Sequence, residues 1–454
     1  ANAMVWVPTL FVEELGGLID KDFNRFVVST HTMALAGSLE SAVKNNRELP
    51  GTLREELAAD RSERVALPRH LNELLRGHPD EVLLRRLPGW LEKAREEDEK
   101  EEVQRRTDRL LTDWLGHRPE AYFAMILLDG DRMGPWLSAD PELTLSHQAS
   151  YHPQIRGALQ HFSGDPNFAA YVVEKRAPSP SRHMAISEAL NHFALELAPA
   201  VAEGCHNGRI LYAGGDDLMV MLPVFNLLPV MAGLRAAYSG VDPAIVGADQ
   251  QGAGFQRQGN GFVYSKKHLL RLMGDKATAS CGAVVAHHQA PLGAVLRELR
   301  AAEKRAKTEG ARDSFSISIV KRSGGALYLT AKWGEPLRLL SRLRAFLAEP
   351  AVSRRAVYNS AVWLRDLPEP EGGGEIAAAM LAYQLERQCS KKTTRDDYDV
   401  PGLARDIVRQ AIAAVSSSKR CAWIENFLSV AEFLARASRT SEGRTKANDQ
   451  EDAA

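Results

Sequence analysis

A Gly-Gly-Asp-Asp sequence between two short apolar runs is the feature that most limits how this chain can fold. Residues 209–213 (RILYA) precede it and residues 218–222 (LMVML) follow it. Two apolar runs around a Gly/Asp turn are typical of a β-hairpin, because both residue types tolerate turn conformations. The sequence therefore predicts a hairpin with Asp216 and Asp217 at its tip.

A second acidic turn follows another apolar run. Residues 122–128 (YFAMILL) are bounded by Asp129, Gly130 and Asp131. The run has the length of a buried strand rather than of a helix. From here to residue 332 the patterns predict, in order, a strand, a helix, the hairpin, a helix, a strand, a helix and two further strands.

This order of elements predicts the α+β fold class. The expected centre is a ferredoxin-like palm domain, as in nucleotide cyclases and polymerases, flanked by helical domains. We expect the helices of the palm to lie on one face of its sheet. In a palm sheet the two acidic turns are neighbours, although they are far apart in the sequence.

The regions on both sides of this centre show the three- and four-residue apolar spacing of helices. We predict five segments: 4–46, a mixed segment; 47–118, a helical domain; 119–335, the palm domain with the hairpin; 336–440, a C-terminal helical domain; and 441–454, a flexible tail. Residues 247–261 are rich in Gly and Gln, which predicts a mobile loop.

Charge and cysteine content exclude several classes of protein. The chain has 57 Lys and Arg against 58 Asp and Glu, so no overall basic field exists to hold nucleic acid. No apolar run approaches the roughly 18 residues of a membrane helix, and no secretory signal opens the chain. Its cysteines are far apart and predict neither a disulfide framework nor a zinc ribbon, which favours a cytoplasmic protein. They are Cys205, Cys281, Cys389 and Cys421.

Carboxylates that converge at one sheet edge repel each other, and a divalent metal relieves that repulsion. Magnesium takes hard oxygen ligands, and two such ions about 4 Å apart can activate a hydroxyl and stabilise leaving pyrophosphate. Gly214 and Gly215 leave room for a triphosphate. The plain alternative is a hairpin with an acidic tip, since turns favour Asp and Gly. The two acidic turns together favour the metal site.

Several motifs resemble the large subunit of type III CRISPR effector complexes. Residues 211–217 (LYAGGDD) resemble its signature, and residues 128–134 (LDGDRMG) are similar to its first palm motif. Residues 26–35 resemble the segment that follows the first palm in the III-B (Cmr) branch. Three further segments agree with the family, at 182–190, 280–292 and 306–324.

The resemblance implies a cyclic oligoadenylate synthetase that uses ATP and is switched on by target RNA. Its implied partners are the other subunits of a type III complex, guide crRNA, target RNA and ATP. Its implied cofactor is Mg²⁺, with Mn²⁺ or Co²⁺ as alternatives. Residues 4–46 would be the remnant of a first palm and a linker.

The resemblance also implies roles for individual residues. The catalytic and metal-binding set is Asp129, Asp216 and Asp217. The nucleotide-binding set comprises Gly130, Asp131, Gly134, Ser187, Gly214, Gly215, Lys307 and Arg312. Within it, the Gly130 carbonyl would help to hold the metals, Lys307 would reach the triphosphate, and Ser187 lies on the helix where the base would be read.

The chain departs from the family in two ways. None of its 13 histidines is followed by Asp, which predicts no His-Asp nuclease in this chain, and the zinc-binding cysteines of the first palm are missing. His287 and His288 are expected to be strand-end residues that point to opposite faces. Two other functions stay open: a catalytically silent scaffold of the same complex, and a GGDEF-like diguanylate cyclase.

Overall fold

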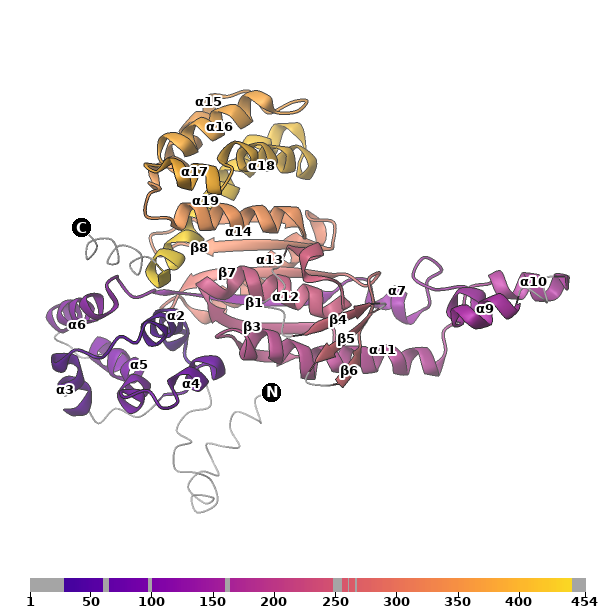
Figure 1. Cartoon of the computed structure of the whole chain (residues 1–454), viewed down its shortest axis with the longest axis horizontal. Helices are drawn as coiled ribbons and strands as arrows, with labels where there is room; N and C mark the ends of the chain where they lie inside the picture. Colours follow the sequence, from indigo (N-terminus) through magenta and orange to yellow (C-terminus); the bar gives the residue numbers. More distant parts are fainter. Residues whose placement is uncertain are drawn as a thin grey trace, which may run out of the picture.

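A six-stranded sheet forms the centre of the molecule (Figure 1). The computed structural model describes residues 28–59, 65–96, 100–159, 164–247, 255–259, 261–265 and 268–442. The strands lie in the order β2-β3-β1-β7-β8-β9. They are β1 (Tyr122–Gly130), β2 (Arg209–Ala213), β3 (Asp217–Pro223), β7 (Ala279–His287), β8 (Ser314–Val320) and β9 (Ala326–Lys332).

The connections place β1 between strands that are distant in sequence. β1 is antiparallel to β3 on one side and to β7 on the other. β2 and β3 form the predicted hairpin, whereas β7 and β8 are parallel and are joined by a helix. The connecting helices are α11 (Pro180–His192), the π-helical turns η2 (Phe193–Leu197) and η3 (Ala200–Gly204), α12 (Leu227–Ser239) and α13 (Leu292–Thr308). The expected mixed α+β architecture is confirmed.

Helices cover both faces of the sheet, so the expectation of helices on one face is wrong. On one face Ala124 and Ile126 of β1 pack in a core with α12, α14 (Glu335–Ala348) and α19 (Arg420–Glu442). On the other face Phe123 and Met125 pack with α13 and α2 (Thr30–Lys44). The physical reason is visible in β7, whose small and apolar residues are buried along the whole strand.

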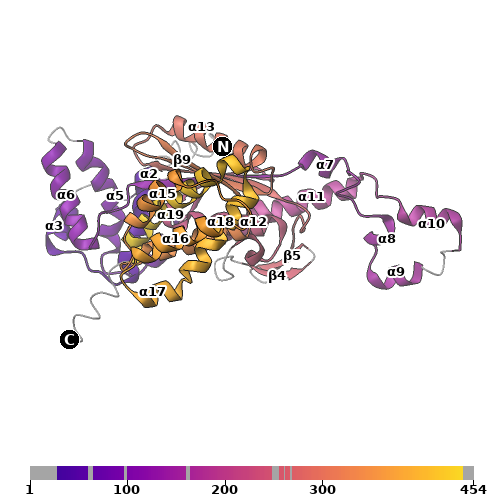
Figure 2. The ribbon, with the colours of Figure 1, turned by 90° about the horizontal axis from the view of Figure 1, so that it is seen from above.

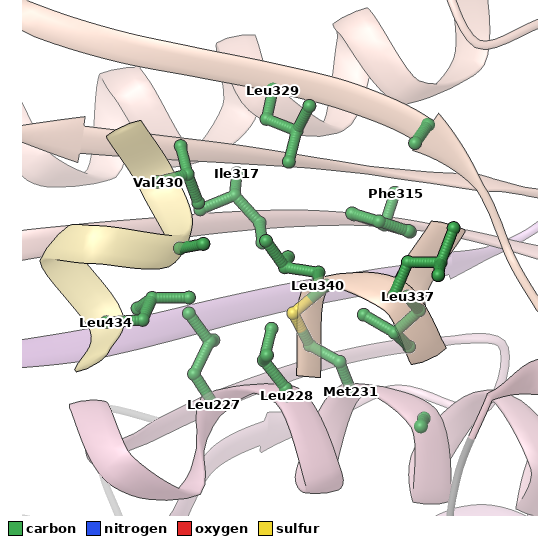
Figure 3. Close-up of a cluster of buried hydrophobic side chains, with 14 of the residues drawn as sticks. Leu227, Leu228, Met231, Phe315, Ile317, Leu329, Leu337, Leu340, Val430 and Leu434 are labelled. Carbon is green, nitrogen blue, oxygen red and sulfur yellow. The ribbon is translucent and has the colours of Figure 1, made fainter. Parts of the chain in front are cut away.

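The larger of these cores joins the sheet to the C-terminal helices. In Figure 3, Ile317 and Leu329 of the sheet face Leu340 of α14 and Val430 of α19, with side chains of α12 beneath them. The remaining C-terminal helices are α15 (Arg355–Asp366), α16 (Glu375–Arg387), α17 (Lys392–Asp397) and α18 (Val400–Ala414). Short 3₁₀ turns occur at η4 (Val224–Asn226), η5 (Pro243–Val246) and η7 (Ser417–Lys419).

The N-terminal helices share a core of their own. Leucines of several helices and Trp114 are buried together there, apart from the sheet. These helices are α3 (Gly51–Ala59), α4 (Arg69–Leu75), α5 (Glu81–Glu96) and α6 (Lys100–Leu115). α2 contacts both this core and the sheet, so it joins the two parts.

An arm leaves the sheet directly after β1 and stands out from the body in two perpendicular views (Figures 1 and 2). It starts at α7 (Met133–Leu137) and carries α8 (His147–Ser150), α9 (Pro153–Leu159) and α10 (Pro166–Val173). None of these four helices has a buried residue. No sequence pattern had predicted this arm.

A small second sheet corrects part of the predicted loop at 247–261. Its strands are β4 (Gln256–Gly259), β5 (Phe262–Ser265) and β6 (His268–Arg271), while residues 248–254 lie outside the described part of the chain. Most of the predicted tail, 443–454, and residues 4–27 also lie outside it. Among the described helices, none combines the length and apolar character needed to cross a membrane.

Candidate active site

The two acidic turns meet at one edge of the sheet. The antiparallel register places Asp129 of β1 directly opposite Asp217 of β3 on one side and opposite Ser280 of β7 on the other. Residues paired in this way point to the same face, with their Cα atoms about 4.5–5.5 Å apart. The Gly130 N–H donates to the Asp216 carbonyl oxygen at 3.0 Å and closes the edge.

The two hairpin acids have different surroundings. Asp217 shares the register and the face of Asp129. Asp216 lies beside Gly130, whose absent side chain faces Tyr238 of α12. Burial raises the pKa of Asp216, and the negative charges of Asp129 and Asp217 raise it further. Asp216 therefore interacts electrostatically with Asp129 and Asp217, although it is not paired with Asp129 across the strands.

Lys307 reaches the acidic edge from the end of α13. Its ammonium group hydrogen bonds to the Asp129 carboxylate and lies 2.6 Å from Oε1 of Glu303. Burial alone would lower the pKa of Lys307, but these hydrogen bonds outweigh it and the pKa is raised. Lys307, which was predicted to bind the triphosphate, is thus a charged residue that here holds the Asp129 carboxylate.

Glu303 was missed by the sequence reasoning. It stands four residues before Lys307 on α13, and this Glu-to-Lys spacing is the one that pairs charges on a helix. That signal was present in the sequence. The spacing alone does not show where the pair points. In the structure the pair faces Asp129 rather than solvent.

Three glycines of the site stand where another residue would clash or be strained. A Cβ at Gly130 would overlap the hydroxyl of Tyr238, whose ring is buried beneath the edge. Gly215 has φ +102°, a conformation that other residues rarely adopt. At Gly214 a Cβ would overlap the Tyr212 hydroxyl, which lies against the Asp217 carboxylate. The charge of that carboxylate raises the pKa of Tyr212.

Asp131 is buried and fully bonded within the protein. Its carboxylate accepts hydrogen bonds from Ser280 Oγ and Thr278 Oγ1, both at 2.8 Å, and from the Asp313 N–H at 3.0 Å. Only 2% of the residue is exposed. Asp131 therefore joins the end of β1 to β7 and to the loop before β8.

That loop holds Arg312 in a strained conformation. Ala311, Arg312 and Asp313 have φ values of 51°, 60° and 43°, each of which costs a non-glycine residue about 1–2 kcal/mol. Asp313 is bound by the buried guanidinium of Arg235 at 2.8 Å. Lys332 Nζ donates to the Arg312 carbonyl oxygen at 2.7 Å. The Arg312 side chain is exposed beside the end of α13.

Two further predicted residues differ in their relation to the site. Ser187 is exposed on α11, one helical turn before Leu190, and Leu190 is the side chain nearest to Gly215. Ser187 therefore lies on the side of α11 that borders the hairpin tip. Gly134 is in α7 at the base of the arm, and a Cβ there would meet nothing within 4 Å.

The donor set fits a divalent cation that also binds substrate. Among the described residues, no three His, Cys, Asp or Glu side chains are close enough to hold an ion by themselves. Magnesium, however, is usually bound by one or two carboxylates together with water and substrate phosphates. Asp129 and Asp217 supply such a pair on one face. A metal at Asp129 would take the place that Lys307 has beside it.

Comparison with known proteins identifies the domain that carries this site. Residues 122–316 match the family described as Cas10/Cmr2, second palm domain. The CRISPR system Cmr subunit Cmr2 of Pyrococcus furiosus is 28% identical over 274 residues, which are 59% of this chain and 27% of that protein. The Cmr2 subunit of Saccharolobus solfataricus is 41% identical over 63 residues, 14% of this chain and 6% of that protein.

Solved structures share the fold over most of the chain. A chain of type III-B Cmr-beta in its apo state has a TM-score of 0.57 and 15% identity, covering 81% of this chain and 43% of the matched one. In Cmr-beta bound to cognate target RNA the TM-score is 0.57 and the identity 16%, covering 84% and 45%. This chain thus spans less than half of the proteins it matches. The resemblance stated from its motifs is confirmed.

Proposed function

From the premise that residues 122–316 form a Cas10/Cmr2 second palm domain, we propose that this chain is the large subunit of a type III-B CRISPR effector that makes cyclic oligoadenylate from ATP. Target RNA, bound by the guide complex, would switch it on. The observation that carries the proposal is the register that sets Asp129 opposite Asp217, with Lys307 at the Asp129 carboxylate. A structural hairpin has no need of this arrangement.

The proposed reaction is nucleotidyl transfer. The 3′-hydroxyl of one adenylate attacks the α-phosphorus of the next ATP, the new P–O bond forms, the bond to the β-phosphate breaks, and pyrophosphate leaves. The hydroxyl proton passes to solvent. Asp129 and Asp217 would hold a divalent ion, which would supply activation of the hydroxyl and stabilisation of the charge on pyrophosphate. Closure of the ring repeats the same transfer within one oligomer.

The remaining residues of the site would bind and orient the nucleotide. Lys307 would leave Asp129 for the triphosphate, where its ammonium group offsets the charge that metal leaves uncovered. Gly215 would let the phosphates approach the backbone at the hairpin tip, whereas at Gly214 the Tyr212 hydroxyl would first have to move aside. Ser187 on α11 would border the base, and the rigid loop before β8 would hold Arg312 toward the phosphates.

The proposal is tested by mass spectrometry of the products formed by the chain in its assembled guide complex. Incubation with ATP, Mg²⁺ and target RNA should give cyclic oligoadenylate, and omission of target RNA should stop it. A product from GTP but not from ATP would favour a diguanylate cyclase. Target RNA bound with no nucleotide product would favour a silent scaffold.

A further inference from the structure

A cavity lies at the end of the sheet that is opposite the acidic edge. It has a volume of about 520 Å³ and is bordered by α6, the connector into β1, the end of β7 and the turn between β8 and β9. In Figure 1, α6 lies beside the end of the sheet that is opposite the arm. Its polar lining includes Asp108, Arg109, Asp113, Arg118, His288 and Arg322.

Three arginines face this cavity without a protein partner. Arg109, Arg118 and Arg322 are exposed, and among the described residues none of their guanidinium groups has an ion pair or hydrogen bond. The backbone at Arg322 is fixed, because its N–H donates to the Tyr122 hydroxyl at 3.1 Å. Unpaired guanidinium groups around a hollow are the typical site for phosphate, which they bind in a bidentate manner.

Histidine rings form another part of the lining. The rings of His287 and His288 lie with centroids 4.6 Å apart and an angle of 30° between their planes. They do not point to opposite faces as expected, because β7 ends at His287 and the alternation of the strand stops there. The ring of His31 on α2 lies 4.8 Å from that of His288. His31 and His287 are buried, whereas His288 is half-buried and lines the cavity, so its ring offers aromatic surface beside the arginines.

We propose that this cavity binds a nucleoside phosphate at a site separate from the acidic edge. The arginines would bind the phosphate, and a base would pack on the ring of His288. The carboxylates of Asp108 and Asp113 would accept hydrogen bonds from ribose hydroxyls or a base amine. Inorganic phosphate has neither a ribose nor a base, so it would place its own charge beside both carboxylates without these contacts. The volume is in the range of about 300–1,000 Å³ that small-molecule sites have.

The position of the cavity suggests what the ligand would do. Its walls come from α6 of the N-terminal helices and from β7 of the palm, so a bound ligand would join the two parts. The chemistry is shared by a free nucleotide and by the 5′-phosphorylated end of an RNA. The proposal does not depend on nucleotidyl transfer at Asp129, because it concerns binding at a different place.

The test measures binding of ATP, AMP and the dinucleotide pApA to the full-length chain by isothermal titration calorimetry. The variant R109Q/R118Q/R322Q should weaken the affinity of one class of nucleotide site by at least about tenfold. Loss of one charge-assisted hydrogen bond has an effect of this size. The control variant R297Q/R300Q changes two exposed arginines of α13 outside the cavity and should change affinity less than twofold. Tighter pApA than AMP binding would identify an RNA end as the ligand, and the reverse a free nucleotide.

Photo-crosslinking with 8-azido-ATP locates the site independently. Labelled peptides should contain residues 118–122 or 287–289, and labelling there should persist in Lys307→Ala. Labelling confined to the acidic edge, or affinities that the triple substitution leaves unchanged, would overturn the proposal. Inorganic phosphate that competes as well as AMP would overturn its nucleoside part. If the triple variant does not fold, Arg322→Gln alone serves, because this side chain is exposed in a turn.

Discussion

The two ends of β1 and β7 carry opposite chemistry. At one end Asp129 lies near the end of β1 and Asp131 directly follows the strand, beside Ser280 at the start of β7. At the other end, Arg118 precedes β1 and β7 ends at His287. The cavity lined by Arg109, Arg118 and Arg322 opens there, and we call it the basic cavity. β1 has nine residues, and the eight steps between them, at about 3.4 Å each, place these ends roughly 27 Å apart.

The difference between these ends is in how their charges are held. Carboxylates at the acidic edge already have protein partners, Lys307 for Asp129 and three donors for Asp131. The arginines of the basic cavity face open space, with no partner among the described residues. The acidic edge is built on strand register, whereas the cavity is built where loops and α6 meet. A cation can thus exchange at the first, and an anion can enter the second.

The largest expected effect separates the two hairpin acids. Asp217→Asn removes the carboxylate opposite Asp129 and should lower oligoadenylate synthesis by at least roughly 10³-fold, because the metal would lose one of its two proposed carboxylate ligands. Asp216→Asn should cost less, and Asp216→Ala/Asp217→Ala should abolish product while leaving assembly intact. Product formation is measured by mass spectrometry. Asp397→Asn, an exposed change on α17, is the control. Full activity in the double variant would remove the hairpin from catalysis.

The next effect compares two lysines on one helix. Lys307→Ala should slow synthesis by about 10²–10³-fold, as for loss of one electrostatic contact to the transition state. Lys304→Ala, on the same helix but exposed and without a charged partner among the described residues, should change the rate less than twofold. Lys307→Arg should restore part of the rate, since it keeps the charge but not the shape. Equal rates for both alanine variants at saturating ATP would mean that Lys307 serves only to hold Asp129.

The sequence predicted the parts of the site that depend on local pattern. Apolar runs around Gly214-Gly215 gave the hairpin, and the strand order brought its tip to Asp129. It did not separate Asp216 from Asp217, because that depends on register, which a one-residue shift reverses. Nor did it show that Asp131 is buried, since this needs Thr278 and Ser280 from a strand far along the chain.

The arm and the basic cavity lay beyond sequence reasoning for a different reason. The helices of the arm have only four to eight residues each, so they are too short for the apolar spacing of a helix to be recognised in the sequence. The arginines of the cavity come from three separate segments, each of which reads as an ordinary charged surface. Only tertiary contact between α6 and the end of β7 brings them together.

A smaller effect tests whether Asp131 supports the edge or binds ligand. Three donors bond to the Asp131 carboxylate, and in Asp131→Asn the NH₂ group, itself a donor, would face at least one of them. The variant should therefore destabilise the fold by about 1–3 kcal/mol. Thermal unfolding followed by intrinsic fluorescence measures this loss. Asp275→Asn, an exposed change in a nearby turn, should leave the melting temperature unchanged. An unchanged melting temperature for Asp131→Asn, with activity lost, would make Asp131 a ligand of the nucleotide or metal.

The smallest effect concerns how much the charge of Asp216, which lies near other carboxylates, destabilises the folded protein. Its pKa is raised in the folded protein by burial and by Asp129 and Asp217. The folded state therefore holds this proton to higher pH than the unfolded chain does. The contribution of Asp216 to stability falls as pH rises from the ordinary Asp value of about 3.9 through the raised folded value. An uncharged residue at this position removes that loss.

Asp216→Asn should accordingly raise the melting temperature of the metal-free protein at pH 7 by roughly 1–3 °C, because the side chain is partly exposed and the effect is screened. As the pH falls through about 3.9 the difference between the variant and the original protein should shrink toward zero, since Asp216 then becomes protonated in both states. Scanning fluorimetry from pH 3.5 to 8 in EDTA measures the difference, with Asp397→Asn as a control that should show none. A melting temperature that is lowered by Asp216→Asn at pH 7, with a loss that shrinks toward low pH, would reverse the sign and show that the anion of Asp216 stabilises the fold. In that case the acidic edge would attract cations through Asp216 as strongly as through Asp217, and the two hairpin acids would be equivalent.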